Sequence, residues 1–406
     1  MCLEMINIRY KERKKVVCLF NSFVSISGGD TRFIEIFKRI SNFDKVIVTP
    51  LKGKRICEQN KLEANFILTT KELHIDNVLF TYFMRFFRTL LLKVEIGDKD
   101  VIYSTSDFLL DTLPAFFWKM RNKNIKWVFC IFLINPTLFR DYSKVFAQNS
   151  GFSMPNLRKV LFFLSQQLTL LIGKRWADQI LVLNKMDREY LIKQRGIAES
   201  MVSVVDGGVD YTHILTLKTK PKKVYAGIFL ARFHPQKGIF DLIKIWKLVC
   251  DKKPAAKLCI IGSGSSQLVE EVKTFIKEND LSRNIEVVGL KLGDEKFSLL
   301  KSSRVFLCPS YYESFAIVIA EAMACGLPVV AYNLPIYGDI YGKTILSVPL
   351  GDVNQFANVV VSLLDDPCLS HNFGLEGQCF VKKYDWVEIA KRELELITNL
   401  QRKQNG

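Results

Sequence analysis

The sequence predicts two α/β domains, each built on an open parallel sheet, that face each other across a cleft. Along almost the whole chain of 406 residues, short apolar runs of strand length alternate with amphipathic segments of helix length. This alternation is typical of parallel sheets covered by helices. A polar, basic stretch at Val205–Lys223 interrupts it with a glycine turn and Pro221. We therefore expect a domain junction there, with about 200 residues on either side.

The part of the chain before the junction supplies the first sheet and its helices. Short apolar runs bounded by polar turns favour strands, and longer segments with an apolar stripe favour helices. The expected strands are Lys15–Phe20, Lys45–Val48, Val101–Ser104, Lys126–Leu133 and Gln179–Leu183. The expected helices are Asp30–Ile40, Val78–Lys93, Leu109–Met120, Asn156–Ile172 and Lys185–Gln194.

The part after the junction repeats the alternation more regularly. The expected strands are Val224–Leu230, Ala256–Ile261, Ile285–Val288, Val305–Cys308 and Pro328–Ala331. The expected helices are Ile239–Cys250, Ser266–Asn279, Asp294–Lys301, Ala316–Cys325, Val353–Leu364 and Trp386–Arg402. This order predicts a second open sheet, followed by a closing pair of helices.

Composition excludes several classes of protein. With 49% hydrophobic and 24% charged residues, the chain is typical of globular proteins rather than disordered or fibrous ones. No uncharged apolar run reaches the roughly 18 residues that a membrane-spanning helix needs. The charged segment Met1–Lys15 lacks the apolar core of a secretory signal, so we expect a cytoplasmic protein. Ten cysteines without a Cys-x-x-Cys pair, and four widely spaced histidines, favour reduced thiols and indicate no metal site.

The charge balance suggests anionic partners. There are 57 Lys and Arg against 41 Asp and Glu, which gives a formal net charge of +16. Phosphate-bearing small molecules, an anionic membrane surface and nucleic acid are the three candidates. The basic residues are dispersed and no recognition motif accompanies them, so we expect no nucleic-acid binding.

The densest chemical signal lies between Arg304 and Ala331, which reads as strand, loop, helix and strand. The helix is apolar except for Glu321, and a buried carboxylate needs hydrogen-bond donors, which ligand hydroxyls could supply. Glu313 precedes it in the loop after the strand, at the edge where open α/β sheets bind ligands. The backbone amides of Ser314–Ile317 open the helix and suit an anion. In the alternative interpretation, Glu321 is paired within the fold and Glu313 is a solvated loop residue. Both interpretations explain the segment equally well.

A second signal is the segment Gly227–Gly238, again strand, loop and helix. Arg232 and Lys237 share this loop, and two cations there suit a diphosphate. Gly238 permits the turn into the next helix, and His234 is interpreted as a structural loop residue. An ordinary basic loop remains the alternative.

Two glycine-containing turns complete the pattern. Ile260-Ile-Gly-Ser-Gly264 ends a strand but lacks the third glycine of a dinucleotide fingerprint. Ser27-Gly-Gly-Asp30 follows the first strand and opens a helix, so its glycines permit close approach to a ligand across the cleft. A plain turn explains the second segment equally well.

In this order, these segments resemble glycosyltransferase family 4, a group of retaining glycosyltransferases with the GT-B fold. The likeness is strongest over Val224–Pro335, where Arg232, Lys237-Gly238, Glu313 and Glu321 precede Ala-Met-Ala-Cys-Gly-Leu-Pro-Val-Val. It is looser in the first half, where the turns at residues 27–30 and 206–210 are similar to the family's glycine-rich loop and interdomain turn. The resemblance implies two Rossmann-like domains facing across a cleft. Residues 1–205 would form the acceptor side and 206–385 the nucleotide-sugar side, and 386–406 would form a helix that packs back on the first domain.

The resemblance also implies a role for each matching residue. Arg232 and Lys237 would hold the donor's diphosphate and stabilise the leaving nucleotide, so that no metal or other cofactor is needed. Glu313 would accept hydrogen bonds from the donor sugar, and Glu321 would bind the ribose. The backbone amides of Ser314, Phe315 and Ala316 would lie near the sugar and phosphate. Gly28 and Gly29 would let the first domain approach the diphosphate. The base would be bordered by Gly289, Leu290 and Lys291.

Two positions depart from the family pattern. Where Glu-Gly-Phe-Gly is common, this chain has Glu313-Ser-Phe-Ala316, which reduces the backbone freedom of the loop. The family often carries a histidine after a strand of the first domain, whereas Val128–Asn135 has none. Asn135 or Asp107 are the candidates to replace it.

The resemblance predicts transfer of a sugar, with retention, from a nucleotide-diphosphate sugar to a hydroxyl of a lipid-linked or growing glycan. Two other functions stay open. The missing histidine suits a non-catalytic sugar-nucleotide binder, and the GT-B fold also suits a UDP-sugar isomerase.

The remaining basic charge suggests a peripheral contact with an anionic membrane. The expected helix Asn156–Ile172 places Leu157, Leu161, Leu164, Leu168 and Leu171 on one face, between Arg158–Lys159 and Lys174–Arg175. Such a helix could lie in a membrane interface or pack in the core, and its other apolar residues slightly favour the core. Further basic residues lie at Lys11–Lys15, Lys119–Lys126 and Lys218–Lys223, and on the aromatic-rich helix with Arg85, Arg88 and Lys93.

Overall fold

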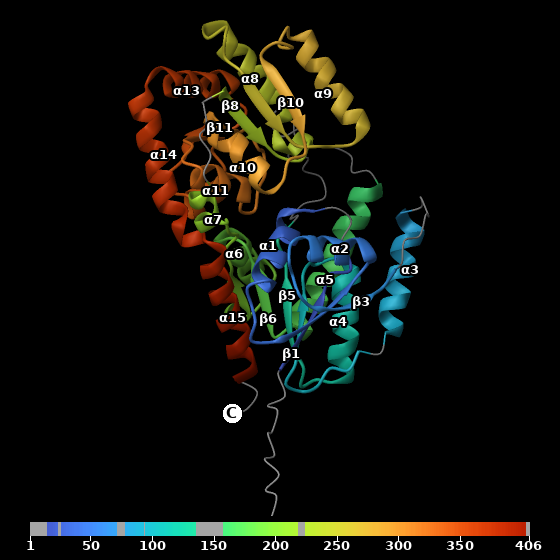
Figure 1. Ribbon diagram of the computed structural model, residues 1–406. Coiled ribbons are helices and arrows are strands. Elements are labelled where there is room, and N and C mark those ends of the chain that lie inside the picture. Colours follow the sequence, from blue (N-terminus) through green and yellow to red (C-terminus); the bar gives the residue numbers. More distant parts are fainter. Residues whose placement is uncertain are drawn as a thin grey trace, which may run out of the picture.

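The chain folds into two α/β units of similar design, one above the other (Figure 1). Each unit is a parallel sheet with the helices that cover it, and we call it a layer. The structure is a computed structural model that describes residues 14–22, 26–70, 78–92, 94–134, 157–217 and 224–402. Most of Lys11–Lys15 and all of Lys218–Lys223 therefore lie outside the described residues, as does Asn135.

The first sheet has seven parallel strands in the order β3-β2-β1-β4-β5-β6-β7. Its strands are β1 (Lys15–Leu19), β2 (Asp44–Thr49), β3 (Asn65–Leu68), β4 (Val101–Ser104), β5 (Lys126–Cys130), β6 (Gln179–Val182) and β7 (Val202–Val204). The accompanying helices are α1 (Gly28–Phe37), α2 (Leu51–Gln59), α3 (Val78–Leu91), α4 (Leu109–Arg121), α5 (Leu157–Trp176) and α6 (Lys185–Glu189), which continues as a π-helical turn over Tyr190–Gln194.

The second sheet has six parallel strands in the order β10-β9-β8-β11-β12-β13. Its strands are β8 (Tyr225–Leu230), β9 (Leu258–Ile261), β10 (Ile285–Gly289), β11 (Ser303–Cys308), β12 (Val329–Tyr332) and β13 (Leu346–Val348). The helices are α7 (Tyr211–Thr216), α8 (Ile239–Lys252), α9 (Ser266–Glu278), α10 (Gly293–Lys301), α11 (Ile317–Ala324), α12 (Pro335–Ile340), α13 (Val353–Asp365), α14 (Pro367–Val381) and α15 (Trp386–Arg402).

Every strand and helix expected from the sequence is present; β4 and α15 have the expected bounds, and the others have ends shifted by a few residues. The expected strand Lys126–Leu133 stops earlier, at Cys130, and α7 lies inside the expected junction. The expectation omitted β3, β7, β13, α2, α7, α12 and α14. The three strands are short, and β3 and β13 alternate little between buried and exposed positions, so their patterns carry a weak signal.

The strand order creates one crevice in each sheet. In the first sheet β1 lies between β2 and β4, and in the second β8 lies between β9 and β11. From β1 and β4, or from β8 and β11, the chain continues toward opposite edges of the sheet, which makes the boundary between the two strands a topological switch point. Ligands of open α/β sheets bind at such switch points, beyond the carboxyl ends of the strands.

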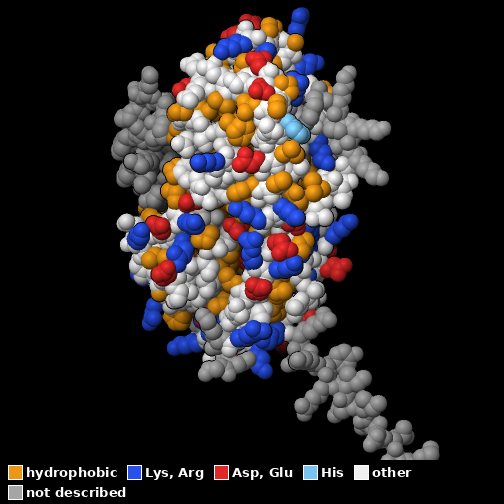
Figure 2. Space-filling view, turned by 90° about the vertical axis from the view of Figure 1, so that its left-hand side faces the viewer, with side chains coloured by type: hydrophobic (Ala, Val, Ile, Leu, Met, Phe, Trp, Pro, Cys, Tyr) orange, Lys and Arg blue, Asp and Glu red, His pale blue; other side chains and the backbone are white. Residues whose placement is uncertain are grey.

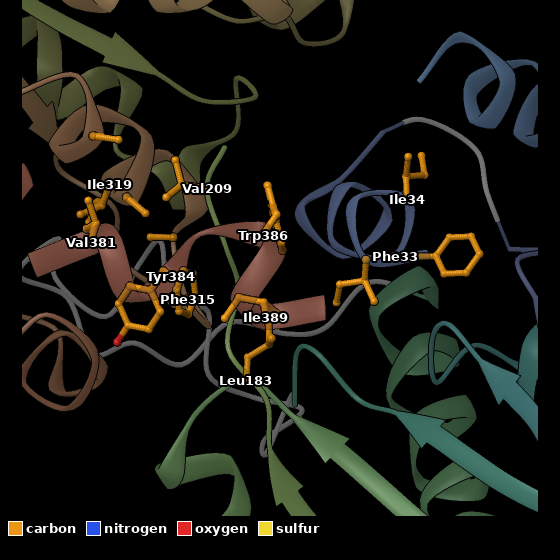
Figure 3. Close-up of a cluster of buried hydrophobic side chains, with 14 of the residues drawn as sticks. Phe33, Ile34, Leu183, Val209, Phe315, Ile319, Val381, Tyr384, Trp386 and Ile389 are labelled. Atoms are coloured by element: carbon orange, nitrogen blue, oxygen red, sulfur yellow. The ribbon is translucent and has the colours of Figure 1, made fainter. Parts of the chain in front are cut away.

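The chain passes between the two layers twice, near Val209 and near Asp385, and these two segments lie side by side. Val209, after the first sheet, accepts a hydrogen bond from the Trp386 amide (3.1 Å) and donates to the Tyr384 carbonyl (2.9 Å). A single hydrophobic cluster runs through this junction and includes Phe33 of α1, Phe315 and Ile389 (Figure 3). The packing of the second layer is therefore continuous with that of the first.

Helix α15 lies against the first layer, although it follows the second in the chain (Figure 1). Its Glu393 is buried and accepts from Arg32 of α1 at 2.7 Å and from the Tyr103 hydroxyl at 2.7 Å. The Arg32 Nε also donates to the Asp206 carbonyl at 2.9 Å. These contacts attach the end of the described chain to α1 and β4.

Candidate functional site

Two loops of the second layer meet at its switch point. The first follows β8 and includes a short 3₁₀ turn over Pro235–Lys237; the second joins β11 to α11. The Tyr311 amide donates to the Gln236 carbonyl at 2.8 Å, and the Gln236 side-chain amide donates to the Tyr312 carbonyl at 2.9 Å. Gln236 thus holds the two loops together, a role that its place in the sequence did not indicate.

Lys237 and Glu313 are brought together by these loops. The Lys237 Nζ lies 2.6 Å from the Glu313 Oε1, and the Glu313 side chain is nearly buried. The pair leaves the second carboxylate oxygen of Glu313 available for a ligand hydroxyl. Arg232 is on the same loop, is exposed, and forms no ion pair within the described part of the chain. Its guanidinium can therefore turn toward an anion.

Gly238 is required by the shape of this corner. Its φ is +69°, and a Cβ there would lie 1.9 Å from the Pro309 carbonyl oxygen. Any other residue would push apart the loops that carry Lys237 and Glu313. The glycine expected to permit the turn is therefore also needed for the contact between the loops that follow β8 and β11.

Glu321 is nearly buried on α11 and is paired within the fold. Lys296 of α10 approaches it to 2.6 Å and also lies over the Phe297 ring, 4.6 Å from its centroid. One carboxylate oxygen is thereby satisfied without a ligand, and the other can still accept a hydroxyl. Lys296 could not be found from the sequence, because its importance depends on how α10 packs beside α11.

The loop before α11 contains a strained backbone position. Ala316 has φ 62° and ψ 65°, in the left-handed region that normally favours glycine. The Tyr341 hydroxyl stands 3.0 Å from the carbonyl oxygens of both Phe315 and Ala316 and donates to this pair. The Phe315 side chain is buried against Tyr341 and Tyr384, so it anchors the loop and only its backbone can face a ligand.

The first layer approaches this loop through α1. A Cβ on Gly28 would lie 3.8 Å from the Ile317 Cδ1, so the first residues of α1 and α11 are neighbours across the cleft. Gly29 instead lies against Phe132, and a Cβ added to this glycine would be 3.1 Å from the ring. Ser27 and Asp30 cap α1 reciprocally. Two helix N-termini therefore direct their positive ends toward one region, an arrangement that attracts an anion.

The segment after β10 forms the far border of the site. Gly289 has φ +74°, and its carbonyl accepts from the Gly262 amide at 3.0 Å. Leu290 follows it and is exposed. Lys291 pairs with Glu295, one residue before Lys296, which connects this border to Glu321.

Two carboxyl groups lie at the switch point of the first layer. Asp111 is buried and accepts from the Asn21 amide at 2.7 Å and the Ser106 hydroxyl at 2.6 Å. Burial outweighs these hydrogen bonds and raises its pKa to about 7. Asp107 accepts from the Gln166 amide at 2.7 Å, and burial raises its pKa to about 6. Within the described residues, no group of three or more His, Cys, Asp or Glu side chains could hold a metal ion.

Comparison with known proteins agrees with this geometry. Residues 216–378, which contain both loops, match the family model described as Glycosyl transferases group 1. An uncharacterized glycosyltransferase of Methanocaldococcus jannaschii is 31% identical over 162 residues, which cover 39% of this chain and 44% of the relative. A phosphatidyl-myo-inositol mannosyltransferase of Mycobacterium leprae is 30% identical over 169 residues, which cover 41% and 44%. The chain spans about half the length of the curated relatives it matches.

Solved structures extend the likeness to both layers. HepE of Anabaena, in complex with UDP and glucose, superposes with a TM-score of 0.72 at 16% identity. The superposition covers 95% of this chain and 100% of that chain. The fold expected from the sequence is thus confirmed: two Rossmann-like domains in the GT-B arrangement.

Proposed function

We propose that the chain is a retaining glycosyltransferase that moves a hexose from a nucleotide-diphosphate sugar to an acceptor hydroxyl. The observation that carries this proposal is the Lys237–Glu313 pair at 2.6 Å, at the switch point of the second sheet and inside the segment that matches the group 1 transferases. The UDP and glucose bound to HepE, a protein of the same fold, support a nucleotide-sugar donor.

The donor's diphosphate would lie between the N-termini of α1 and α11. Arg232 and Lys237 would supply the positive charge, in the manner of a metal-independent transferase, and Gly28 would allow the backbone of α1 to approach. Glu321, held by Lys296, would accept a ribose hydroxyl through its second oxygen. Gly289, Leu290 and Lys291 would border the base.

The reaction would break the bond between the anomeric carbon and the diphosphate oxygen and form a bond from the acceptor oxygen on the same face. The proton of the acceptor hydroxyl would pass to the departing diphosphate oxygen. The electron pair of the broken bond goes to the diphosphate, where Arg232, Lys237 and the two helix N-termini stabilise it. Glu313 would hold the sugar by its hydroxyls while the anomeric carbon becomes oxocarbenium-like. Release of Lys237 from Glu313 toward the phosphate would couple donor binding to the start of the reaction.

We further propose that the acceptor is a lipid-linked or growing glycan, and that the enzyme works in the cytoplasm. The Mycobacterium leprae relative is a phosphatidyl-myo-inositol mannosyltransferase, and this supports a lipid-bearing acceptor. Nine described cysteines without a disulfide support a reducing compartment.

The test is incubation with a panel of radiolabelled UDP-, GDP- and ADP-sugars and a membrane extract. Transfer of label to an extractable lipid or glycan, with retention at the anomeric carbon by NMR, is the expected result. If the free donor is epimerised instead, the proposed function is wrong and the protein is an isomerase. Donor binding, measured by a thermal shift, without transfer or epimerisation across the panel would leave a sugar-nucleotide binder.

A further inference from the structure

Helix α5 is oriented with its apolar face outward. Leu161, Leu164, Leu168 and Leu171 are 52%, 57%, 46% and 66% exposed, whereas the polar Gln166 and Thr169 are buried. The spacing of three, four and three residues places the four leucines on one face of the helix. A helix that packs on a sheet normally buries such a face. Helix α5 thus packs on the first sheet through Leu170 and Gly173, as the core interpretation expected, but its leucine face is left outside.

The inverted orientation is held by specific contacts. The Gln166 amide donates to the Asp107 carboxylate at 2.7 Å and to the Leu133 carbonyl at 2.8 Å. On the same side, Gly173 lies so close to the Phe129 ring that an added Cβ would be 2.4 Å away. A rotation that buried the leucines would break the hydrogen bonds of Gln166 and insert larger side chains against β5.

Neighbouring helices extend the exposed apolar surface. On α3, Phe83, Phe87 and Leu91 recur every four residues and are 59%, 44% and 79% exposed. Helix α4 packs against both α3 and α5 and adds the exposed Phe117 and Met120. Figure 1 shows the three helices together on one side of the first sheet. We name these nine residues the apolar face: Phe83, Phe87, Leu91, Phe117, Met120, Leu161, Leu164, Leu168 and Leu171.

Cations outnumber acidic residues around the apolar face, where Glu95 and Asp98 are exposed between α3 and β4. Helices α3 and α5 contain no Asp or Glu, and Asp111, the one carboxylate of α4, is buried. Exposed cations lie on the three helices or directly after α4: Arg88, Arg121, Lys123, Lys174 and Arg175. The face that carries α14 and α15 is different, because acidic and basic side chains are interspersed there (Figure 2). On that face Glu388 pairs with Lys391 and Asp206 with Arg392.

We propose that the apolar face docks the protein on an anionic bilayer. Leucine and phenylalanine side chains would enter the boundary between head groups and acyl chains, and the surrounding cations would lie at the lipid phosphates. A second copy of the chain fits the same surface poorly, since an isologous contact would bring cation against cation. No helix of the described residues is long and apolar enough to cross a membrane, so the contact would be interfacial.

Docking there would place the cleft beside the lipid. Gln166 links α5 to Asp107, in the loop after β4 at the switch point of the first sheet. This edge faces the loops that carry Lys237 and Glu313. The bilayer proposal does not depend on the proposed transfer reaction, because membrane binding is measured without a donor or acceptor.

The test is co-sedimentation of the full chain with vesicles of phosphatidylglycerol and phosphatidylcholine, and with vesicles of phosphatidylcholine alone. We expect binding to the anionic vesicles that weakens as salt is raised. Leu164→Ser with Leu168→Ser should weaken binding by about tenfold for each leucine, the loss expected from the burial of one such side chain. The matched control is Leu375→Ser, an exposed leucine on α14, which should bind like the wild type.

Three outcomes would overturn the proposal. The wild type would fail to sediment with anionic vesicles, or Leu164→Ser with Leu168→Ser would bind as well as Leu375→Ser. The third outcome is a dimer of the wild type, measured by light scattering, that becomes a monomer in Leu164→Ser with Leu168→Ser. This result would assign the apolar face to a second copy of the chain. Circular dichroism and the Tm of each variant show that the exposed substitutions leave the fold intact.

Discussion

Lys237 and Glu313 are the residues on which the proposed chemistry most depends. Lys237→Ala should lower the transfer rate by at least about a hundredfold, because the charge that develops on the leaving diphosphate loses a preorganised cation. Glu313→Ala should lower it similarly through loss of the hydrogen bonds to the sugar. Radiolabel transfer at saturating donor measures both effects.

Lys244→Ala is the control for this pair, since Lys244 is an exposed lysine on α8, seven residues after Lys237. It should retain the wild-type rate. Both site variants should keep a cooperative thermal transition, because Lys237 is partly exposed and Glu313 lies in a loop outside the helices and strands. Wild-type rates in either variant would refute the assignment of the pair to the active site.

Ala316 stores backbone strain at the position where the resembling family commonly has glycine. Its left-handed conformation costs an alanine roughly 1 kcal/mol more than a glycine. We expect Ala316→Gly to raise the free energy of unfolding by about 0.5–1 kcal/mol, with the gain reduced by the greater entropy of glycine in the unfolded chain.

Urea denaturation measures this change, and Ala320→Gly provides the comparison. Ala320 is buried inside α11, where glycine should lower the free energy of unfolding by about 1 kcal/mol. Equal effects of the two substitutions would show that the loop conformation of Ala316 is not strained.

At the scale of elements, the sequence predicted what depends on local pattern. The strands β1, β4, β8 and β11 are apolar and bounded by polar turns, so they and the loops that follow them were identifiable. Helix α2 was missed because Leu51–Gln59 contains Gly53 and many charges. The orientation of α5 was not predictable, since Gln166 is recognised as an inward anchor only when Asp107 and Leu133 lie beside it.

The loop between β1 and α1 depends on a carboxyl group of α4. Asp111 accepts from the amides of Asn21 and Ser22, which begin this loop. Its folded-state pKa of about 7 lies above the ordinary value of 3.8. Between these values the folded chain binds more protons than the unfolded chain, so this group makes the free energy of unfolding fall as pH rises from about 4 to about 7.

Asp111→Asn should remove this dependence while keeping the shape and the acceptor for the Asn21 amide. We expect the stability of the wild type, relative to the variant, to decrease from about pH 4 to about pH 7 in urea denaturation. A difference that stays constant or grows with pH would contradict the raised pKa. In the variant, the asparagine Nδ2 can donate to the hydroxyls of Ser22 and Ser106, which in the wild type donate to the Asp111 Oδ2. Both serines therefore keep a partner.

For the whole molecule, the sequence indicated the division into two layers more clearly than the contacts that join them. Residues 206–210 were identifiable as a turn, but their pairing with Tyr384–Trp386 joins positions far apart in the chain. Similarly, Lys296 and Glu321 come from separate helices of one layer. Contacts of this kind follow from the packing of elements, which periodicity does not describe.

The buried Arg32–Glu393 pair fastens α15 to α1 and so contributes to holding both layers together. Glu393→Ala would leave the Arg32 guanidinium buried beside Tyr103 without a counter-charge, and should lower the free energy of unfolding by about 3–5 kcal/mol. Replacing both residues by leucine should cost less, because no uncompensated charge remains. Glu395→Ala, an exposed glutamate on the same helix, should change stability by less than about 0.5 kcal/mol. Urea denaturation separates these cases, and a double substitution more damaging than Glu393→Ala would show that packing around the pair, rather than its charge, holds α15 in place.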